Sequence, residues 1–211
     1  MVAGLVALVA AAPAPAGAIR EQPVPVLAYY DISIDAGAWD RAGADLPRLG
    51  RYSSDDDSVV RRHIVMARSA GIGGFLVGWS NTPVLNPRLE RLIEAAEDEQ
   101  FKLGLVYQGP LPVTRAAADL DVFAASYAAS TAFQLFDKPL VVVAGSWERS
   151  PEDLAALVAP RRDRLLVLAS ERSAEEYRRL GRAVDGNALY RPSADPSDGP
   201  GYQQGLDELG G

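Results

Sequence analysis

The feature that most constrains the fold is a repeated alternation between short apolar runs and amphipathic helix patterns. One cycle is clear from Gly71 to Asn81: a helix pattern ends at Gly71, residues 75–77 are continuously apolar, and an aromatic and polar cluster follows. A continuous apolar run is typical of a strand buried on both faces, as in parallel sheets. Because strand–helix alternation implies parallel strands joined by right-handed crossovers, the sequence predicts an α/β fold.

The same cycle recurs along the chain, in about six strand–helix units of roughly thirty residues each. Strands are predicted at residues 26–30, 75–77, 101–107, 139–144, 165–169 and 184–190. Helices are predicted to begin near residues 53, 86, 113, 150 and 173, most of them at Ser, Asp or Asn residues that can cap a first turn. The helix that begins at Val113 is predicted to end near Ser130.

Two architectures fit this alternation: an open doubly wound sheet and a (β/α)8 barrel of the TIM type. A nucleotide-binding doubly wound sheet carries Gly-x-Gly-x-x-Gly just after its first strand. Here Gly71, Gly73 and Gly74 precede a strand instead. We therefore predict the TIM-barrel type. A complete barrel typically takes about 250 residues. The chain has 211 residues, so the barrel is predicted to be incomplete, with about six units.

The N-terminal segment is apolar and Ala-rich and ends in Ala16-Gly17-Ala18, which is typical of a signal peptide with an A-x-A cleavage site. Its apolar run is too short to span a bilayer comfortably. The predicted organisation is a signal peptide over residues 1–18, a linker over 19–25 and a partial (β/α) barrel domain over 26–211. The protein is then expected to be secreted or extracytoplasmic, with no stable membrane insertion after the signal is removed.

Composition excludes several classes of function. The chain has no cysteine and one histidine, His63, which removes disulfides, thiolate zinc sites and a cysteine nucleophile. Its formal net charge is −7 and its basic residues are scattered, so nucleic acid is not an expected partner. Residues 55–57 are three aspartates that suit a helix N-terminus and lack the spacing of a calcium loop. We predict neither a metal nor a cofactor.

Candidate binding residues gather at the predicted C-terminal ends of the strands, where both architectures bind ligands. Aromatic faces stack on the C–H surfaces of sugars, while amides and carboxylates bind sugar hydroxyls. This composition favours a carbohydrate cleft, and an oligosaccharide or polysaccharide is the expected partner. The predicted substrate-binding residues are Tyr29, Tyr30, Asp31, Trp79, Asn81, Tyr107, Gln108 and Trp147, with Tyr190 and Arg191 at a further strand end. For each tyrosine, packing in the core is the alternative.

Glycoside hydrolysis needs two carboxyl groups that flank the scissile bond. Glu148 and Glu171 follow successive predicted strands and can face one pocket, so they are the predicted catalytic acids. The alternative for both is a solvated loop or the acidic first turn of a helix. His63, beside Arg61 and Arg62, is predicted to be a surface or hydrogen-bonded histidine.

Several ordered segments, at residues 26–30, 50–56, 70–79 and 138–143, resemble the glycoside hydrolase family 99-like proteins. These are (β/α)8 barrels related to endo-α-mannosidases and, more distantly, to the family 71 α-1,3-glucanases. The resemblance extends from Val26 to about Tyr190. It implies an exported glycan-processing barrel without a redox cofactor, in which Tyr29, Tyr30 and Trp79 line the sugar subsites.

The sequence also departs from this family. The family's catalytic acids form a Glu-x-x-Glu arrangement on a late strand, and the only late glutamate here is Glu208. Glu148 and Glu171 do not match that arrangement, and Gly78 replaces the serine usual before the tryptophan. We expect a glycoside hydrolase-like protein acting on an α-linked glycan, which is inactive if the chain is truncated. The alternatives are a non-catalytic carbohydrate-binding protein and an open α/β sheet that binds a small polar ligand.

Overall fold

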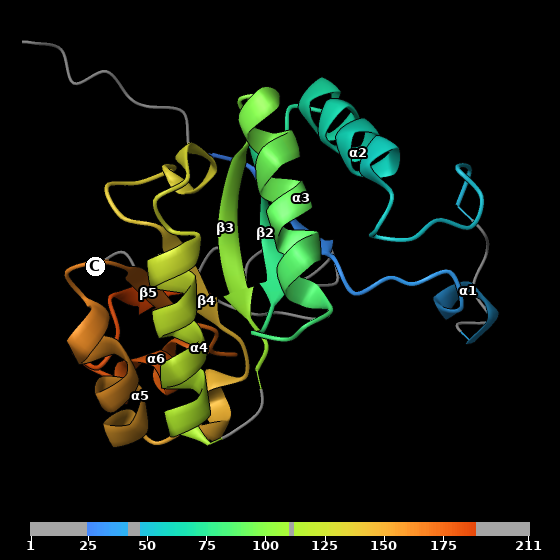
Figure 1. Ribbon diagram of the computed structural model, residues 1–211. Coiled ribbons are helices and arrows are strands. Elements are labelled where there is room, and N and C mark those ends of the chain that lie inside the picture. The colour runs from blue at the N-terminus through green and yellow to red at the C-terminus, as the bar shows by residue number, and fades with distance from the viewer. Residues whose placement is uncertain (1–24, 42–46, 110–111, 189–211) are drawn as a thin grey trace, which may run out of the picture.

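The computed structural model (Figure 1) describes residues 25–41, 47–109 and 112–188. The strands are β1 (Leu27–Asp31), β2 (Gly74–Trp79), β3 (Lys102–Tyr107), β4 (Leu140–Val143), β5 (Leu166–Ala169) and β6 (Gly186–Asn187). The α-helices are α1 (Ala38–Arg41), α2 (Asp57–Ser69), α3 (Leu85–Asp98), α4 (Val113–Ser126), α5 (Pro151–Val158) and α6 (Ala174–Arg178). Three short 3-10 helices are η1 (Thr131–Phe133), η2 (Ser146–Glu148) and η3 (Ala159–Arg161). The predicted signal peptide, and Tyr190 and Arg191, lie outside the described residues.

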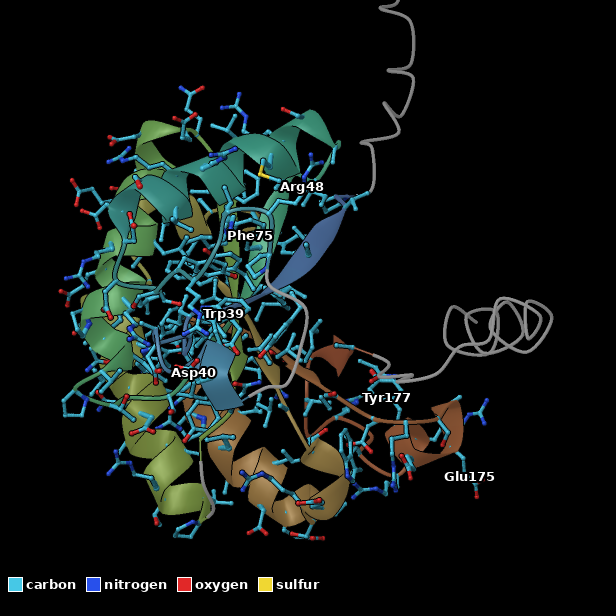
Figure 2. All side chains as sticks on the ribbon, turned by 90° about the vertical axis from the view of Figure 1, so that its right-hand side faces the viewer. Trp39, Asp40, Arg48, Phe75, Glu175 and Tyr177 are labelled. Carbon is cyan, nitrogen blue, oxygen red and sulfur yellow. The ribbon has the colours of Figure 1, made fainter. Side chains whose placement is uncertain are left out.

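The six strands form one parallel sheet in the order β1-β2-β3-β4-β5-β6. A doubly wound sheet reverses its strand order at a switch point, and no reversal occurs among these strands. The side view in Figure 2 has the long helices along one side of the sheet. This is the arrangement of a TIM barrel, in which helices form an outer ring. Among the described residues β1 and β6 each pair on one side only, so the barrel is incomplete here, as predicted.

Successive side chains of each strand point to opposite faces of the sheet, so one set enters the core and the other set forms an inner face. On the helix-facing side, β2 contributes Phe75, Val77 and Trp79, which are all buried. The opposite side carries Gly74, Leu76 and Gly78, and Leu76 is only partly buried. Neighbouring strands follow the same division: the buried helix-facing residues are Leu103, Leu105, Tyr107, Val141, Val143, Val167 and Ala169. The hydrophobic core therefore lies between the sheet and its helices.

Local signals explain where the helices begin. Asp56 caps α2 by accepting hydrogen bonds from the amides of Ser58 and Val59. Ser150 and Ser173 cap α5 and α6, as predicted. The helix predicted to reach Ser130 is shorter, because α4 ends at Ser126. Ser130 instead caps η1, where its hydroxyl accepts from the amide of Ala132 and donates to the carboxylate of Glu97.

Two features of the described residues bear on wider classes of function. None of their helices is both long and apolar enough to cross a membrane. They also contain no group of three or more histidine, aspartate or glutamate side chains placed to hold a metal ion.

Candidate functional site

The inner face of the sheet carries a bridge between β1 and the end of β3. The amide Nε2 of Gln108 donates to the hydroxyl of Tyr29 over 2.6 Å. The bridge passes over Gly78 of the intervening strand, where a Cβ atom would lie 2.5 Å from Tyr29 Oη and 2.9 Å from Gln108 Oε1. Only glycine leaves this space open. Tyr29 is 54% exposed, so the bridge presents an aromatic ring and an amide to solvent at the C-terminal end of the sheet.

Asp31 extends the same inner row, since its Cα lies in register with Gly78. Its side chain is exposed, and its Oδ1 accepts a hydrogen bond from the amide of Ser33. The four residues Tyr29, Asp31, Gly78 and Gln108 are called the inner rim below. Three of them were predicted as binding residues, and the structure brings those three to one face.

Tyr30 lies on the opposite face from Tyr29. Its ring stacks on Phe75 with centroids 4.4 Å apart, and its hydroxyl lies 3.0 Å from Nδ1 of His63 in α2. Burial raises the pKa of Tyr30. The predicted role of Tyr30 in sugar binding does not fit this position, whereas the prediction of a hydrogen-bonded histidine at residue 63 does.

Trp79 is fully buried, with 0% of its surface exposed. Its ring packs near Phe123 and Tyr127 at the end of α4. Its Nε1 donates to Asn86 Oδ1 over 3.1 Å, and Asn86 Nδ2 in turn donates to Asn81 Oδ1 over 2.7 Å. Trp79 therefore has no open face for stacking, and the side chain of Asn81 is engaged in holding it.

Tyr107 is also a core residue. Its hydroxyl donates to Asp119 Oδ2 over 3.0 Å, and Asp119 Oδ1 pairs with Nε of Arg115 at 2.9 Å. Burial, followed by the charge of Asp119, raises the pKa of Tyr107. The structure thus does not support the predicted contacts of Trp79 and Tyr107 with a substrate, because both side chains point under α4.

The two predicted catalytic acids lie in different environments. Glu171 is fully buried. Ser146 Oγ donates to its Oε1 over 2.7 Å, and Arg179 Nη2 lies 3.5 Å from its Oε2. This carboxylate joins η2 to the segment around α6. Glu148 is exposed at the end of η2. A buried, fully engaged carboxylate and an exposed one do not form the facing pair that hydrolysis needs.

Trp147 occupies the half-buried middle of η2, at the end of β4. The guanidinium of Arg172 lies 5.3 Å from the centroid of its ring, a cation–π contact. Arg172 also pairs with Glu176 at 2.6 Å. The structure keeps Trp147 at the C-terminal end of the sheet, as predicted, with Arg172 against the ring.

The long segment between β1 and α2 is anchored to the fold by Arg88, which the sequence reasoning missed. Arg88 is buried, and its guanidinium donates to both oxygens of Asp55 and to the carbonyl of Ile32. The hydrogen bonds with Arg88 lower the pKa of Asp55 to about 2. An arginine beside Leu89, within the apolar stripe of a predicted helix, was the available signal.

Aromatic side chains join the same segment to the core. Trp39 Nε1 donates to the carbonyl of Tyr52 over 2.7 Å, and the rings of these residues lie 4.9 Å apart. Tyr52 in turn contacts the ring of His63 at 5.1 Å. Figure 2 shows Trp39 and Phe75 on the same side of the molecule as β1. Burial, followed by the charge of Arg62, lowers the pKa of His63.

Neither a protein-family model nor a curated protein matches the sequence. Solved structures do match the fold. The GH99 endo-alpha-mannosidase from Bacteroides thetaiotaomicron superimposes with a TM-score of 0.70 at 18% sequence identity, covering 85% of this chain and 66% of that one. The same enzyme in complex with Bis-Tris-propane gives 0.70 and 19%, covering 85% and 64%. A glycoside hydrolase-like protein gives 0.55 and 15%, covering 90% and 67%.

At these identities the similarity concerns the fold. The chain spans just under two thirds of the endo-alpha-mannosidase structures that it matches. The sequential parallel sheet and its helices on one side correspond to the barrel that the sequence resemblance implied. The chain has the fold of the GH99-like barrels, in the incomplete form that the described residues present.

Proposed function

We propose that this chain binds an α-linked glycan at the inner rim, as part of a glycoside hydrolase-like barrel. The observation that carries the proposal is the Tyr29–Gln108 bridge over Gly78. It combines an exposed aromatic ring with amide groups at the end of the sheet where barrels of this type place their sites. Solved neighbours of the fold are described as endo-alpha-mannosidases, which supports a glycan as the ligand class.

The arrangement of carboxyl groups favours binding over hydrolysis by this chain alone. The positions of Glu148 and Glu171 do not provide a facing pair of carboxyl groups. Asp31 is an exposed carboxyl group of the inner rim, but a second one does not accompany it there. The second candidate function, a non-catalytic carbohydrate-binding protein, is favoured by this arrangement.

The test is a titration of the purified chain with α-mannan and α-1,3-glucan oligosaccharides, with binding followed by calorimetry and product release assayed in the same samples. Saturable binding without release is the expected result. Binding with release that survives both Glu148→Gln and Glu171→Gln would place the acids elsewhere. A folded sample that binds neither glycan would contradict the proposal.

We also propose an extracytoplasmic location, which rests on the apolar segment and the Ala16-Gly17-Ala18 pattern. Expression with the native N-terminus, followed by N-terminal sequencing of the exported and retained fractions, tests it. A mature N-terminus at Ile19 in the exported fraction is expected. A chain that is retained with Met1 intact would contradict this location.

A further inference from the structure

Arg149, directly after η2, is a buried cation that the fold leaves without a matching anion. It is 7% exposed, yet its Nε and Nη1 atoms have no hydrogen-bond partner among the described residues. The other buried arginines are paired: Arg88 with Asp55 and Arg161 with Asp121. Burial lowers the pKa of Arg149. A buried charge is normally paired or hydrogen-bonded, so this guanidinium calls for a partner beyond the described residues.

The described surroundings of Arg149 supply no such partner. Burial raises the pKa of Tyr107, and the positive charge of the nearby Arg149 partly offsets that rise. Asp119, the acceptor for Tyr107, has its other oxygen paired with Arg115. Glu148 and Asp153 attract Arg149 electrostatically, but neither forms an ion pair or a hydrogen bond with it among the described contacts. The Nε and Nη1 donors of Arg149 therefore remain unpaired among the described residues.

We propose that Arg149 is the centre of an oxyanion-binding site near the C-terminal ends of β3 and β4, which takes a carboxylate, sulfate or phosphate group. The planar fork of a guanidinium suits bidentate binding of such groups. With 7% of its surface exposed, Arg149 lies close beneath the surface, and an ion reaches it only if neighbouring side chains move. The site lies at the same end of the sheet as the inner rim but on the helix-facing side, where the hydroxyl of Tyr107 points under α4. The source of the oxyanion is then a free ion or an acidic substituent of a larger ligand.

The experiment measures thermal unfolding and calorimetric binding with sodium sulfate, against sodium chloride at matched ionic strength. For the wild-type chain, sulfate at ten times its Kd is expected to raise Tm by about 3 to 6 °C. Chloride at the same ionic strength is expected to leave Tm unchanged. Arg149→Met keeps the length of the side chain without its charge and is expected to abolish the sulfate response. Arg68→Met is the matched control: Arg68 is exposed and paired with Glu99, and its loss is expected to leave the response unchanged.

The sulfate response decides the inference. Absence of the response in the wild-type chain, or its persistence in Arg149→Met, overturns the site. If Arg149→Met does not fold, Arg149→Lys takes its place: it keeps a charge but loses the fork, and an unchanged sulfate Kd in that variant overturns the site equally.

Further ligands identify the source of the oxyanion and separate this inference from the proposed function. Inorganic phosphate, a uronate-containing oligosaccharide and a neutral α-mannan oligosaccharide are titrated in parallel. Tighter binding of the acidic than of the neutral oligosaccharide, lost in Arg149→Met, supports a glycan substituent. Binding of the neutral oligosaccharide without any oxyanion response leaves the proposed function standing and overturns the site. An oxyanion response without binding of any glycan supports the site and contradicts the proposed function.

Discussion

The two faces of the sheet use the same strands for different purposes. The helix-facing side is filled with large side chains, and residues such as Trp79 and Leu105 have no exposed surface. On the inner side, β2 alternates Gly74 and Gly78 with the partly buried Leu76, and Tyr29 and Gln108 beside it are exposed. The comparison shows that the end of a strand does not define a site in a parallel sheet. The face on which a side chain lies decides whether an aromatic residue supports the fold or meets a ligand.

The largest expected effect is on the helix-facing side. Trp79→Ala should reduce the free energy of unfolding by about 3–5 kcal/mol, because it removes a fully buried ring and leaves a cavity against α4. Urea denaturation measures it, and Tyr29→Ala on the inner face is the matched control, with an expected loss below about 1 kcal/mol because its ring is already half exposed. Equal losses of unfolding free energy in the two variants would contradict the different roles of the two faces.

The next effect concerns the anchor of the segment between β1 and α2. Asp55→Asn should destabilise the chain by about 1–3 kcal/mol at pH 7, because it leaves the buried guanidinium of Arg88 poorly paired. The folded pKa of Asp55 is lowered to about 2 from an ordinary value of 3.8. The stabilisation that ionised Asp55 gives the folded chain is therefore fully present above pH 3.8 and is lost as the pH falls toward 2.

Acid unfolding of the wild-type and Asp55→Asn chains, followed by circular dichroism, checks this prediction. The two stabilities should converge between about pH 4 and pH 2. Asp56, the cap of the same helix, gives a useful second variant: Asp56→Asn keeps a good capping residue and should cost less than Asp55→Asn. A larger loss for Asp56→Asn would show that the cap, rather than Arg88, holds the segment.

A third prediction acts on the inner face alone. Gly78→Ala places a methyl group against Tyr29 Oη and Gln108 Oε1, the flexible ends of two side chains. We expect the bridge to open at a cost of about 1 kcal/mol in stability, while glycan affinity falls about tenfold. Calorimetric titration of the glycan measures the affinity. Unchanged affinity in Gly78→Ala would show that the bridge is not part of the binding surface.

The smallest effect comes from His63. Its folded pKa is lowered by burial, so protonation favours the unfolded chain. The free energy of unfolding therefore carries no penalty from His63 above the ordinary pKa of about 6.5, and it falls as the pH drops below that value. Because His63 is the only histidine, His63→Gln should remove this dependence between about pH 7 and pH 5. Tm measured across that range checks it, and a decline in His63→Gln as steep as in the wild-type chain would contradict it.

The sequence predicted the fold better than the site. Alternating apolar runs and caps identified the six strands and most helix starts, because burial on both faces and N-terminal capping leave local signals. The faces were harder to assign, since a strand buried on both sides lacks polar alternation. A usable signal was present: Phe75, Val77 and Trp79 share one parity, while Gly74 and Gly78 share the other. Glu171 likewise follows Val167 and Ala169 at every second position, and like them it is buried.

Contacts between distant segments lay beyond any local pattern. The Tyr29–Gln108 bridge depends on the register of three strands, and the ion pair between Arg88 and Asp55 joins residues that lie 33 positions apart. Each residue alone was compatible with a surface position. Only the pairing of β1, β2 and β3, and the packing of α3 against the segment before α2, bring the partners together.

The central claim is that glycan binding belongs to the inner face and not to the buried aromatic residues. The most direct measurement is the calorimetric affinity of α-mannan oligosaccharides for the wild-type, Tyr29→Ala and Trp79→Phe chains, each shown to be folded. We expect Tyr29→Ala to weaken binding at least about tenfold, and Trp79→Phe to bind as the wild-type chain does. Wild-type affinity in Tyr29→Ala together with loss of binding in folded Trp79→Phe would contradict the account.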